Sequence, residues 1–437
     1  MPWNVFILGY DELGRQLLPR LQHVEDYAFH GLLSLDEAVH TEDYDVDALL
    51  SEATAKLDRF PGTVDAVCSY WDFPTSGLAP LIRRHFGLRG PSLEAVLKCE
   101  HKYWSRVEQS RVVGDCIPAF QALDPFGDDP VGQVELPYPF WIKPVKAHSS
   151  QLGFRVDSPS VLERVIPEIR ENIGRLADPF DRVVAHADVP SDIAAITGHQ
   201  CIIEEIISAG RQFTLEGYVQ DGQVHVYGVV DTIRDPRRRS VLCRYSYPSR
   251  LPRRVQHRMI EATTRLMTRI GYDDAPFNIE FYYDGRKDRI HLLEVNSRLS
   301  RSHAAVFLLV DGAPHFQVMV DVALGLKPRM PRRKGRYAVA AKHMMRVFSD
   351  GVVRRVPSED RIRQVEERFP GTLVELNVEP GTRLSELLHQ DSYSYELGVV
   401  FIGAHNDNEL RHRIRACEAM LPFEIEPVVR TESRGLS

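Results

Sequence analysis

The stretch IHLLEVNSRLSRSH, residues 290–303, joins an apolar run to a series of polar side chains. The apolar residues at its start predict a buried β-strand. Because alternate side chains on a strand face the same way, Glu294 and Asn296 project together, and Arg298 lies just beyond them if the strand continues. A carboxylate, an amide and a guanidinium on one side of a buried strand indicate a polar site at its end.

A second carboxylate is predicted to lie opposite the first. Residues 277–295 hold an Asp-Gly pair at 284–285 between two β-rich runs, which is a strong hairpin signal and places Glu280 on the arm that faces Glu294. Two carboxylates and the amide oxygen of Asn296 form an oxygen-only ligand set, which suits Mg²⁺ when a nucleotide supplies the remaining oxygens. An exposed hairpin with ordinary surface charges is the alternative, and spacing alone leaves both interpretations open.

The composition is that of an ordinary globular protein. The chain has 437 residues, of which 43% are hydrophobic and 26% charged, and this length predicts roughly two to four domains. Its 54 Lys and Arg residues are outnumbered by 61 Asp and Glu residues, which gives a net charge of −7. Because contact with a phosphate backbone needs a basic surface, this charge argues against a nucleic-acid partner.

Cysteine usage and hydropathy indicate a soluble cytoplasmic protein. The six cysteines are scattered and form no C-x-x-C pair, which argues against a zinc cluster or a disulfide scaffold and favours a reducing compartment. Residues 1–14 have no basic n-region and only a short apolar run, so a signal peptide is not expected. The longest comparable apolar run, AAVFLLV at 304–310, is far shorter than a membrane span. We therefore expect no membrane partner.

The N-terminal segment predicts a small α/β domain with a parallel sheet. NVFILGYDELGRQLLPRL, residues 4–21, has the pattern of a strand, a glycine turn and an amphipathic helix, and two further apolar strand segments follow it. Gly9 and Gly14 could flank a phosphate loop, but the complete G-x-G-x-x-G fingerprint is absent. Turning the chain from strand to helix is the alternative role for these glycines.

Helical patterns and another hairpin follow along the chain. Residues 91–110 begin with a proline and continue with helical spacing. A second Asp-Gly pair, at 221–222, predicts another hairpin, and residues 255–270 have the apolar spacing of a helix that Gly271 closes.

A basic, proline-containing segment, KPRMPRRKGR at 327–336, is the predicted linker before the last domain. That domain mixes strand segments with one well-capped helix over 406–421. The predicted domains span residues 1–95, 96–330 and 331–437.

Other segments of the sequence make the interpretation of the polar strand end more specific. EVNSRLSRSH (294–303) resembles the E-x-N-x-R segment of the ATP-grasp superfamily, in wording close to carbamoyl phosphate synthetase halves and biotin carboxylase. Four further segments resemble family features and follow in the family's order. HKYWSR (101–106) resembles the segment of the entry lysine, and FWIKPV (140–145) resembles the strand of the phosphate lysine. CIIEEIISAGRQFTLEGYV (201–219) resembles the adenine hinge, and FNIEFYYDG (277–285) resembles the strand of the first metal carboxylate. The resemblance implies an α/β and α+β protein with a Rossmann-like pre-ATP-grasp domain, a two-subdomain ATP-grasp fold and a small C-terminal α+β domain.

The resemblance also implies an ATP site built from several segments. The implied contacts are Lys102 and Lys143 at the phosphates, Ser149 and Ser150 in the loop between them and the next strand, Glu204 with the backbones of Glu205 and Ile207 at the adenine, and Gln212 near the ribose.

The implied reaction centre lies at the strand end. The implied ligands of one or two Mg²⁺ ions, with Mn²⁺ as an alternative, are Glu280, Glu294 and Asn296. Arg298 would face the transferred γ-phosphoryl group, and Arg301 would help it to stabilise an acyl phosphate and a tetrahedral intermediate. His303 is a candidate polar contact in this pocket, and a structural histidine is the alternative.

Two positions depart from the family pattern. The loop KAHSSQLGF, residues 146–154, contains a single glycine, Gly153, where relatives are glycine-rich, so serine side chains would replace backbone donors and the closing motion is in question. Ser302 stands where biotin carboxylases have the glutamate that deprotonates bicarbonate.

These features lead to three hypotheses. The main one is an ATP-dependent ligase that joins a small-molecule carboxylate to an amine through an acyl phosphate and releases ADP and phosphate. The second is an ATP-grasp enzyme that activates bicarbonate or phosphorylates a hydroxyl or enol acceptor. The third is a nucleotide-binding regulatory protein without catalysis. Whether the protein forms a homodimer is left open.

Overall fold

The computed structural model describes residues 1–39, 44–147, 152–208, 210–238, 241–387 and 394–428. The chain forms two compact units. The larger unit comprises Met1–Thr232, Pro248–Ala304 and Ala313–Arg332, and the smaller comprises Ile233–Tyr247, Ala305–Gly312 and Arg333–Ser437.

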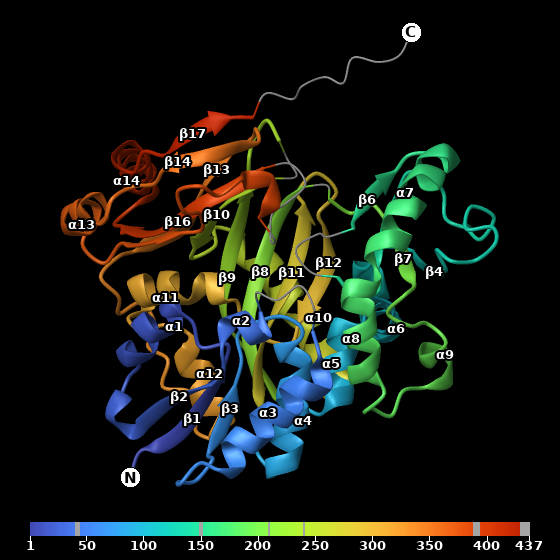
Figure 1. The fold of residues 1–437 in the computed structure, drawn as a ribbon, viewed down its shortest axis with the longest axis horizontal. Helices are drawn as coiled ribbons and strands as arrows, with labels where there is room; N and C mark the ends of the chain where they lie inside the picture. The colour runs from blue at the N-terminus through green and yellow to red at the C-terminus, as the bar shows by residue number, and fades with distance from the viewer. Residues whose placement is uncertain (40–43, 148–151, 209, 239–240, 388–393, 429–437) are drawn as a thin grey trace. The chain divides into compact units, whose positions relative to one another are not determined.

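The larger unit begins with a parallel three-stranded sheet in the order β2-β1-β3 (Figure 1). Its strands are β1 (Trp3–Leu8), β2 (Tyr27–Leu33) and β3 (Ala66–Cys68), and its helices are α1 (Glu12–Leu17), α2 (Leu35–Ala38), α3 (Val46–Asp58) and α4 (Thr75–Phe86). The predicted parallel α/β arrangement is confirmed.

Gly9, between β1 and α1, and Gly14, inside α1, are glycines for different structural reasons. Gly9 has a φ of +66°, a backbone conformation that favours glycine. A Cβ at Gly14 would lie 2.3 Å from the hydroxyl oxygen of Tyr70, so no larger residue fits there without a shift. The observation at Gly9 supports the chain-turning interpretation, whereas Gly14 is explained by close packing inside α1.

The helix predicted over residues 91–110 is in fact two helices. α5 (Leu93–Glu100) ends at His101, and α6 (Lys102–Val113) begins directly after it. His101 has an extended backbone, and its Nδ1 accepts a hydrogen bond from the backbone N–H of Trp104 at 3.2 Å, so it caps the second helix. The prediction of one continuous helix is wrong because a side-chain cap overrides the helical spacing. The break places Lys102 at the first position of α6.

A small antiparallel sheet follows, in the order β4-β7-β5-β6. Helix α7 packs its apolar side on this sheet and closes a separate core that includes Leu162, Ile166 and Phe140. The elements of this part are β4 (Phe120–Leu123), β5 (Phe140–Pro144), β6 (Phe154–Val156), α7 (Pro159–Asn172), α8 (Gly174–Val184), α9 (Ser191–Ala194) and β7 (Cys201–Glu205).

The rest of the larger unit contains the two predicted hairpins, which pair in the order β12-β11-β8-β9. The elements are β8 (Arg211–Gln220), β9 (Gln223–Arg234), α10 (Arg253–Ile270), β11 (Ala275–Asp284), β12 (Arg289–Asn296) and α12 (Phe316–Ala323). Asp221 and Gly222 have φ angles of 49° and 72°, which a two-residue turn of the predicted kind requires. Gly271 closes α10 with a φ of 73°. Both hairpins and this helix are confirmed.

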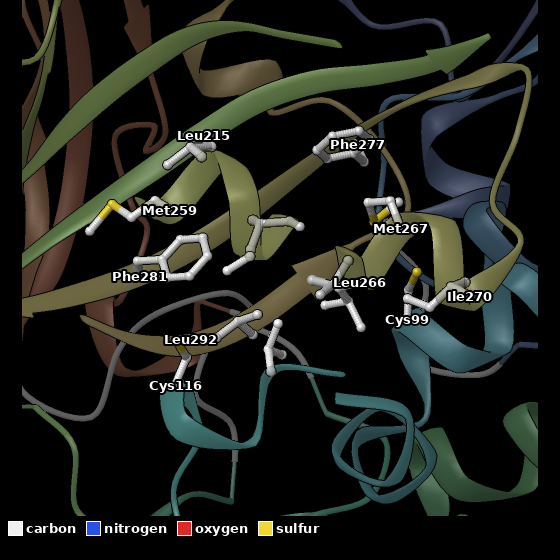
Figure 2. Packing of buried hydrophobic residues seen from close by; sticks show 14 of the residues in the cluster. Cys99, Cys116, Leu215, Met259, Leu266, Met267, Ile270, Phe277, Phe281 and Leu292 are labelled. Atoms are coloured by element: carbon white, nitrogen blue, oxygen red, sulfur yellow. The ribbon is translucent and has the colours of Figure 1, made fainter. Parts of the chain in front are cut away.

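One face of these strands is apolar and packs on α10. Figure 2 shows Met259 and Leu266 of the helix facing the strands that carry Phe281 and Leu292. All four side chains are fully buried. Because side chains alternate along each strand, the opposite face is left for polar residues.

The smaller unit is a mixed α+β structure whose strands pair in the order β10-β13-β16-β15. Its elements are β10 (Leu242–Tyr247), α11 (Ala304–Asp311), β13 (Val339–Val347), β14 (Gly351–Arg355), α13 (Glu359–Arg368), β15 (Leu373–Leu376), β16 (Tyr395–Ala404), α14 (Asp407–Met420) and β17 (Glu424–Pro427). Asn406 caps α14 as expected. Arg333, where the last segment of this unit begins, lies within the predicted linker, and the division into three domains stays a prediction.

Among the described residues, no single helix is long and apolar enough to cross a membrane. Arg301–Asp311 and Phe316–Ala323 reach that length and composition only when taken together across a break.

We predict that Phe281→Ala lowers the free energy of unfolding by roughly 3–5 kcal/mol, because it leaves a cavity between the strands and α10. Phe126→Ala is the matched control, since Phe126 is 49% exposed, and we expect it to change stability by no more than about 0.5 kcal/mol. Chemical denaturation followed by circular dichroism measures both. Equal effects of the two substitutions would contradict the described packing.

Candidate functional site

The polar face of β8, β11 and β12 brings the predicted metal ligands together. The strand register places Glu280 opposite Glu294, and Asn278 opposite Asn296. Nδ2 of Asn296 donates to Oδ1 of Asn278 at 2.8 Å, which fixes the orientation of the Asn296 amide. Nε2 of Gln212 donates to Glu280 at 2.5 Å, so Gln212 also belongs to this face.

A β-bulge explains why apolar residues precede these polar ones in the sequence. The register pairs Phe281 with Leu292 but Glu280 with Glu294, so Leu293 is the extra residue. The bulge changes which face the following residues take. Leu292 therefore packs in the apolar core, while Glu294, only two residues later, lies on the polar face.

The donor set fits a hard cation that arrives with further oxygen ligands. It consists of two carboxylates and one amide oxygen, the ligand type that Mg²⁺ prefers. No group of three or more His, Cys, Asp or Glu side chains that could hold a metal occurs in the described part of the chain. The protein would thus supply only part of a coordination shell, as expected for Mg²⁺ bound to a nucleotide. The role of Glu280, Glu294 and Asn296 as ligands stays a prediction.

Lys102 is partly buried beside this face. Its backbone N–H donates to the carbonyl of Val145 at 3.1 Å, and its Nζ donates to the carbonyl of Ala147 at 2.6 Å. Burial lowers the pKa of Lys102 to about 8; Glu294 opposes this shift, and the nearby ammonium groups of Lys143 and Lys146 add to it. The three lysines and Glu294 thus belong to one electrostatic environment.

Lys143, on β5, is held by Glu204. Its Nζ lies 2.7 Å from one oxygen of Glu204, and the other oxygen accepts from Nε of Arg106 at 2.6 Å. Burial raises the pKa of the Glu204 carboxyl, but Arg106 and Lys143 outweigh it and bring the pKa down to about 2. Glu204 is therefore ionised and acts as a counter-charge here; its predicted place beside adenine stays a prediction.

The remaining predicted nucleotide contacts lie on β7, just after it, or outside the described residues. Glu205 is exposed, and its backbone N–H donates to the carbonyl of Ala119 at 2.9 Å. Ile207 is buried just after β7. Ser149 and Ser150 lie outside the described residues.

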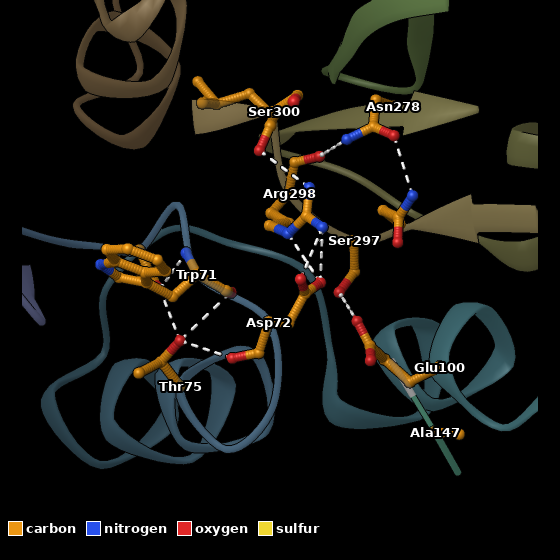
Figure 3. Close-up of polar contacts among 12 residues, drawn as sticks. Trp71, Asp72, Thr75, Glu100, Ala147, Asn278, Ser297, Arg298 and Ser300 are labelled. Atoms are coloured by element: carbon orange, nitrogen blue, oxygen red, sulfur yellow. Dashed lines mark hydrogen bonds and ion pairs between the residues drawn. The ribbon is translucent and has the colours of Figure 1, made fainter. Parts of the chain in front are cut away.

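Both predicted catalytic arginines pair with aspartates of the N-terminal sheet. Figure 3 shows the guanidinium of Arg298 facing Asp72, with Nε and Nη2 each 2.7 Å from a carboxylate oxygen. Arg301 donates from Nε to Asp11 at 2.5 Å, and its guanidinium lies 5.2 Å from the centre of the Trp71 ring. Burial lowers the pKa of Arg298, but Asp72 outweighs it and the net pKa is raised, so the guanidinium keeps its charge.

His303 lies in a buried pair. Its Nδ1 is 2.6 Å from an oxygen of Glu216, and both side chains are almost fully buried. Burial raises the pKa of Glu216 well above its ordinary value. Nδ1 of His315 lies 3.8 Å from the other oxygen of Glu216 and shares a hydrogen bond of 3.1 Å with the hydroxyl of Tyr227. This environment agrees with a structural histidine, and a catalytic role for His303 stays a prediction.

Sequence analysis missed five residues of this site, which are Asp72, Glu100, Arg106, Lys146 and Asn278. Lys146 pairs with Glu100, whose other oxygen accepts from the hydroxyl of Ser297 at 2.7 Å. Arg106 stands within HKYWSR, the segment that carries Lys102, and Lys146 directly follows FWIKPV, the segment that carries Lys143, so a search for further charges there could have found them. Asp72 carries no such signal, since its partner is distant in sequence.

Comparison with known proteins supports the predicted fold. Residues 136–304 match the family model of the ATP-grasp domain. A search of curated proteins gave no match.

Solved structures resemble the whole chain. The fold is similar to that of an L-amino acid ligase from Bacillus licheniformis, with 16% identity, a TM-score of 0.71 and coverage of 97% of this chain and 98% of that chain. It is also similar to biotin carboxylase from Campylobacter jejuni, with 15% identity, a TM-score of 0.62 and coverage of 97% and 92%. A third similar structure is phosphoribosylglycinamide synthetase from Anaerococcus prevotii, with 12% identity, a TM-score of 0.61 and coverage of 98% of this chain and 100% of that chain. These likenesses show the fold, and the predicted ATP-grasp architecture is confirmed.

We predict that kcat/KM for ATP falls as the pH rises through about 8, where Lys102 loses its charge. The sign follows because the charged ammonium form attracts phosphate, and kcat/KM reports the ionisation of the free protein. Lys102→Arg should keep the charge and remove this decline below pH 10. A profile that stays flat from pH 7 to 10 in the parent protein would contradict the role of Lys102.

Proposed function

Because the chain contains an ATP-grasp domain, we propose that it is an ATP-dependent ligase that joins a carboxylate to an amine through an acyl phosphate. The observation that carries this proposal is the polar face on which Glu280 and Glu294 oppose each other beside Asn296. Lys102 and Lys143 flank that face from neighbouring segments.

Each group has a role that follows from its charge. ATP supplies the phosphoryl group, and Mg²⁺ held by Glu280, Glu294 and Asn296, or Mn²⁺ in its place, would neutralise charge on the phosphates. Lys102 and Lys143 would bind the phosphate oxygens. The protein then contributes mainly positioning and charge neutralisation, which dominate phosphoryl transfer.

The reaction has two displacements. An oxygen of the substrate carboxylate attacks the terminal phosphorus, and the bond from phosphorus to the bridging oxygen breaks so that ADP leaves with the electron pair. The amine nitrogen then attacks the acyl carbon, the carbon–oxygen bond to phosphate breaks, and orthophosphate leaves. The nitrogen loses its proton to solvent or to a nearby base. Arg298 and Arg301 would stabilise the anionic acyl phosphate and the tetrahedral intermediate.

Bicarbonate activation or phosphorylation of a hydroxyl or enol acceptor is the alternative chemistry for the same ATP site. The similarity in fold to biotin carboxylase favours considering it. Ser302 counts against the carboxylase form, because a serine hydroxyl is a far weaker base than a glutamate. A non-catalytic nucleotide-binding protein is disfavoured by the complete set of charged residues at the site. Small-molecule substrates, a cytoplasmic location and a homodimer stay predictions.

We predict that Glu294→Gln raises the Mg²⁺ concentration needed for half-maximal ATP turnover by on the order of tenfold or more, because the site loses one of two anionic ligands. Glu261→Gln is the matched control, since Glu261 is an exposed residue of α10. A Mg²⁺ titration of ADP release measures both variants. An unchanged titration for Glu294→Gln would mean that the polar face is ordinary protein surface.

We also predict that turnover yields ADP and orthophosphate, because lysines and Mg²⁺ around the terminal phosphates favour attack at the terminal phosphorus. A coupled screen of carboxylic acids for ADP release, with products identified by mass spectrometry, tests this. Hydroxylamine added without the amine should trap the acyl phosphate as a hydroxamate. AMP with pyrophosphate would refute the mechanism, and ADP without hydroxamate from an acid that is consumed would favour the hydroxyl kinase.

A further inference from the structure

Asp72 lies where a parallel α/β sheet binds its ligands. Strand β1 pairs with β2 on one side and β3 on the other, so the chain reverses its direction of travel along the sheet between β1 and β3. Ligands of open α/β sheets bind beyond the carboxyl ends of the strands at such a switch point. Asp11 follows β1 and Asp72 follows β3, so both acids stand at this position.

The loop that carries Asp72 is held in place by its own hydrogen bonds. Oγ1 of Thr75 lies 2.8 Å from the carbonyl oxygen of Asp72, and Oγ of Ser69 donates to Thr75 at 2.9 Å (Figure 3). Nε1 of Trp71 donates to the carbonyl of Gly9 at 2.7 Å, which ties this loop to the end of β1. A carboxylate on such a fixed loop is preorganised for binding.

Of the two aspartates, Asp72 is the one that a substrate can reach. Its side chain is 35% exposed, whereas that of Asp11 is 3% exposed. Asp11 is enclosed by the hydroxyl of Tyr70 at 2.6 Å, the backbone N–H of Gly14 at 2.9 Å and the guanidinium of Arg301. Asp11 is therefore a buried support for Arg301, while Asp72 forms part of the surface that faces solvent.

The partner of Asp72 is the arginine proposed to bind the acyl phosphate. When an anionic phosphate binds Arg298, the guanidinium shares its charge with that phosphate, and Asp72 loses part of its counter-charge. Glu100, which is close enough to Asp72 to interact with its charge, is itself balanced by Lys146. It supplies no counter-charge to Asp72, so Asp72 then favours a new cation. The nucleophile of an amine ligase arrives in water mainly as a cation, an ammonium group.

We propose that Asp72 binds the ammonium group of the amine substrate beside Arg298 and thereby selects a basic amine as the nucleophile. This inference rests on the proposed ligase function and names the residue that recognises its second substrate. Asp72 is a specificity-determining residue in this role. It places the nitrogen next to the acyl group that Arg298 holds, at the junction of the N-terminal sheet and β12. The bound ammonium ion loses one proton to solvent before attack, because only the neutral amine has the lone pair that forms the new bond, and the second proton leaves after attack.

Binding of amines tests the inference without knowledge of the natural substrate. The α-amides of the L-amino acids, without those of aspartate and glutamate, carry an ammonium group but no carboxylate, and they are titrated calorimetrically into the protein saturated with Mg²⁺ and a non-hydrolysable ATP analogue. We expect one or more of them to bind and Asp72→Asn to weaken binding by roughly 10- to 100-fold, as the loss of a charge-assisted hydrogen bond implies. The Nα-acetylated forms of those with an uncharged side chain should not bind.

A matched control separates this effect from a general change in charge. Asp26→Asn removes an aspartate that pairs with Arg329 at 2.9 Å just before β2, at the opposite edge of the same sheet, and should leave amine binding unchanged. Asp72→Glu keeps the charge and should retain part of the affinity. Equal affinity of the parent and Asp72→Asn proteins, or no binding of any amide to a parent protein that binds the ATP analogue, would overturn the inference. Failure to bind the analogue would instead refute the proposed function, and the inference with it.

Turnover distinguishes substrate binding from the mere positioning of Arg298. Hydroxylamine is uncharged at neutral pH and needs no carboxylate partner, so Asp72→Asn should still form hydroxamate from an activated acid while its KM for a basic amine rises. If Asp72 only orients Arg298, hydroxamate and amide formation fall together, and the inference is wrong. A melting temperature within a few degrees of the parent protein shows that the variant is folded.

Discussion

The buried guanidinium of Arg106 connects three elements that build the proposed nucleotide site. From α6 it donates to Glu204 on β7 at 2.6 Å and to the carbonyls of Leu292 and Leu293 on β12 at 3.1 and 2.7 Å. A planar group with five fixed donors is suited to such a junction, and a lysine could not make the same contacts. Burying this charge is costly unless its donors are satisfied. The bond to Glu204 helps to hold Lys143, and the bonds to β12 lie directly before Glu294. One residue therefore connects the lysine proposed to bind phosphate with the carboxylate proposed to bind the metal.

Charge balance around Arg106 follows from the same constraint. Lys143 pairs with Glu204 and Lys146 with Glu100, while Lys102 has Glu294 as its stabilising neighbour. Each lysine thus has a carboxylate that lets it remain in a largely buried site before any phosphate binds. Such an arrangement fixes positive charges in advance, so that little reorganisation is needed when a polyanion enters. The pKa of Lys102 is lowered first by its burial and then by the nearby ammonium groups of Lys143 and Lys146.

Local patterns predicted the elements correctly, whereas the connections between distant elements could not be predicted. Asp-Gly turns, a glycine helix cap and alternating apolar residues each depend on neighbours within a few positions, so both hairpins and α10 followed from the sequence. The bulge at Leu293 could not be predicted, because one extra residue on one strand is defined only by its pairing with the other strand. The break between α5 and α6 at His101 was not predicted, because the side-chain cap of His101 competes with a helical pattern that continues on both sides. Asp72 and Arg298 are 226 positions apart, and no periodicity relates them.

Arg298 pairs with Asp72, and Arg301 pairs with Asp11. These pairs show why the N-terminal sheet matters to the polar end of β12. Each arginine alone, in a partly buried position beside carboxylates and lysines, would lack a defined direction. The bidentate pair of Arg298 with Asp72 fixes the plane of that guanidinium as well as its position. Asp72 and Asp11 both stand directly after neighbouring parallel strands. The carboxyl ends of β1 and β3 therefore orient the last charged residues of the E-x-N-x-R-x-x-R segment. The proposed metal ligands come from one hairpin and the lysines from two other segments. The site is thus completed by a sheet from the opposite end of the unit's sequence. The fold has to bring all of them together before any of these groups can act on a phosphate.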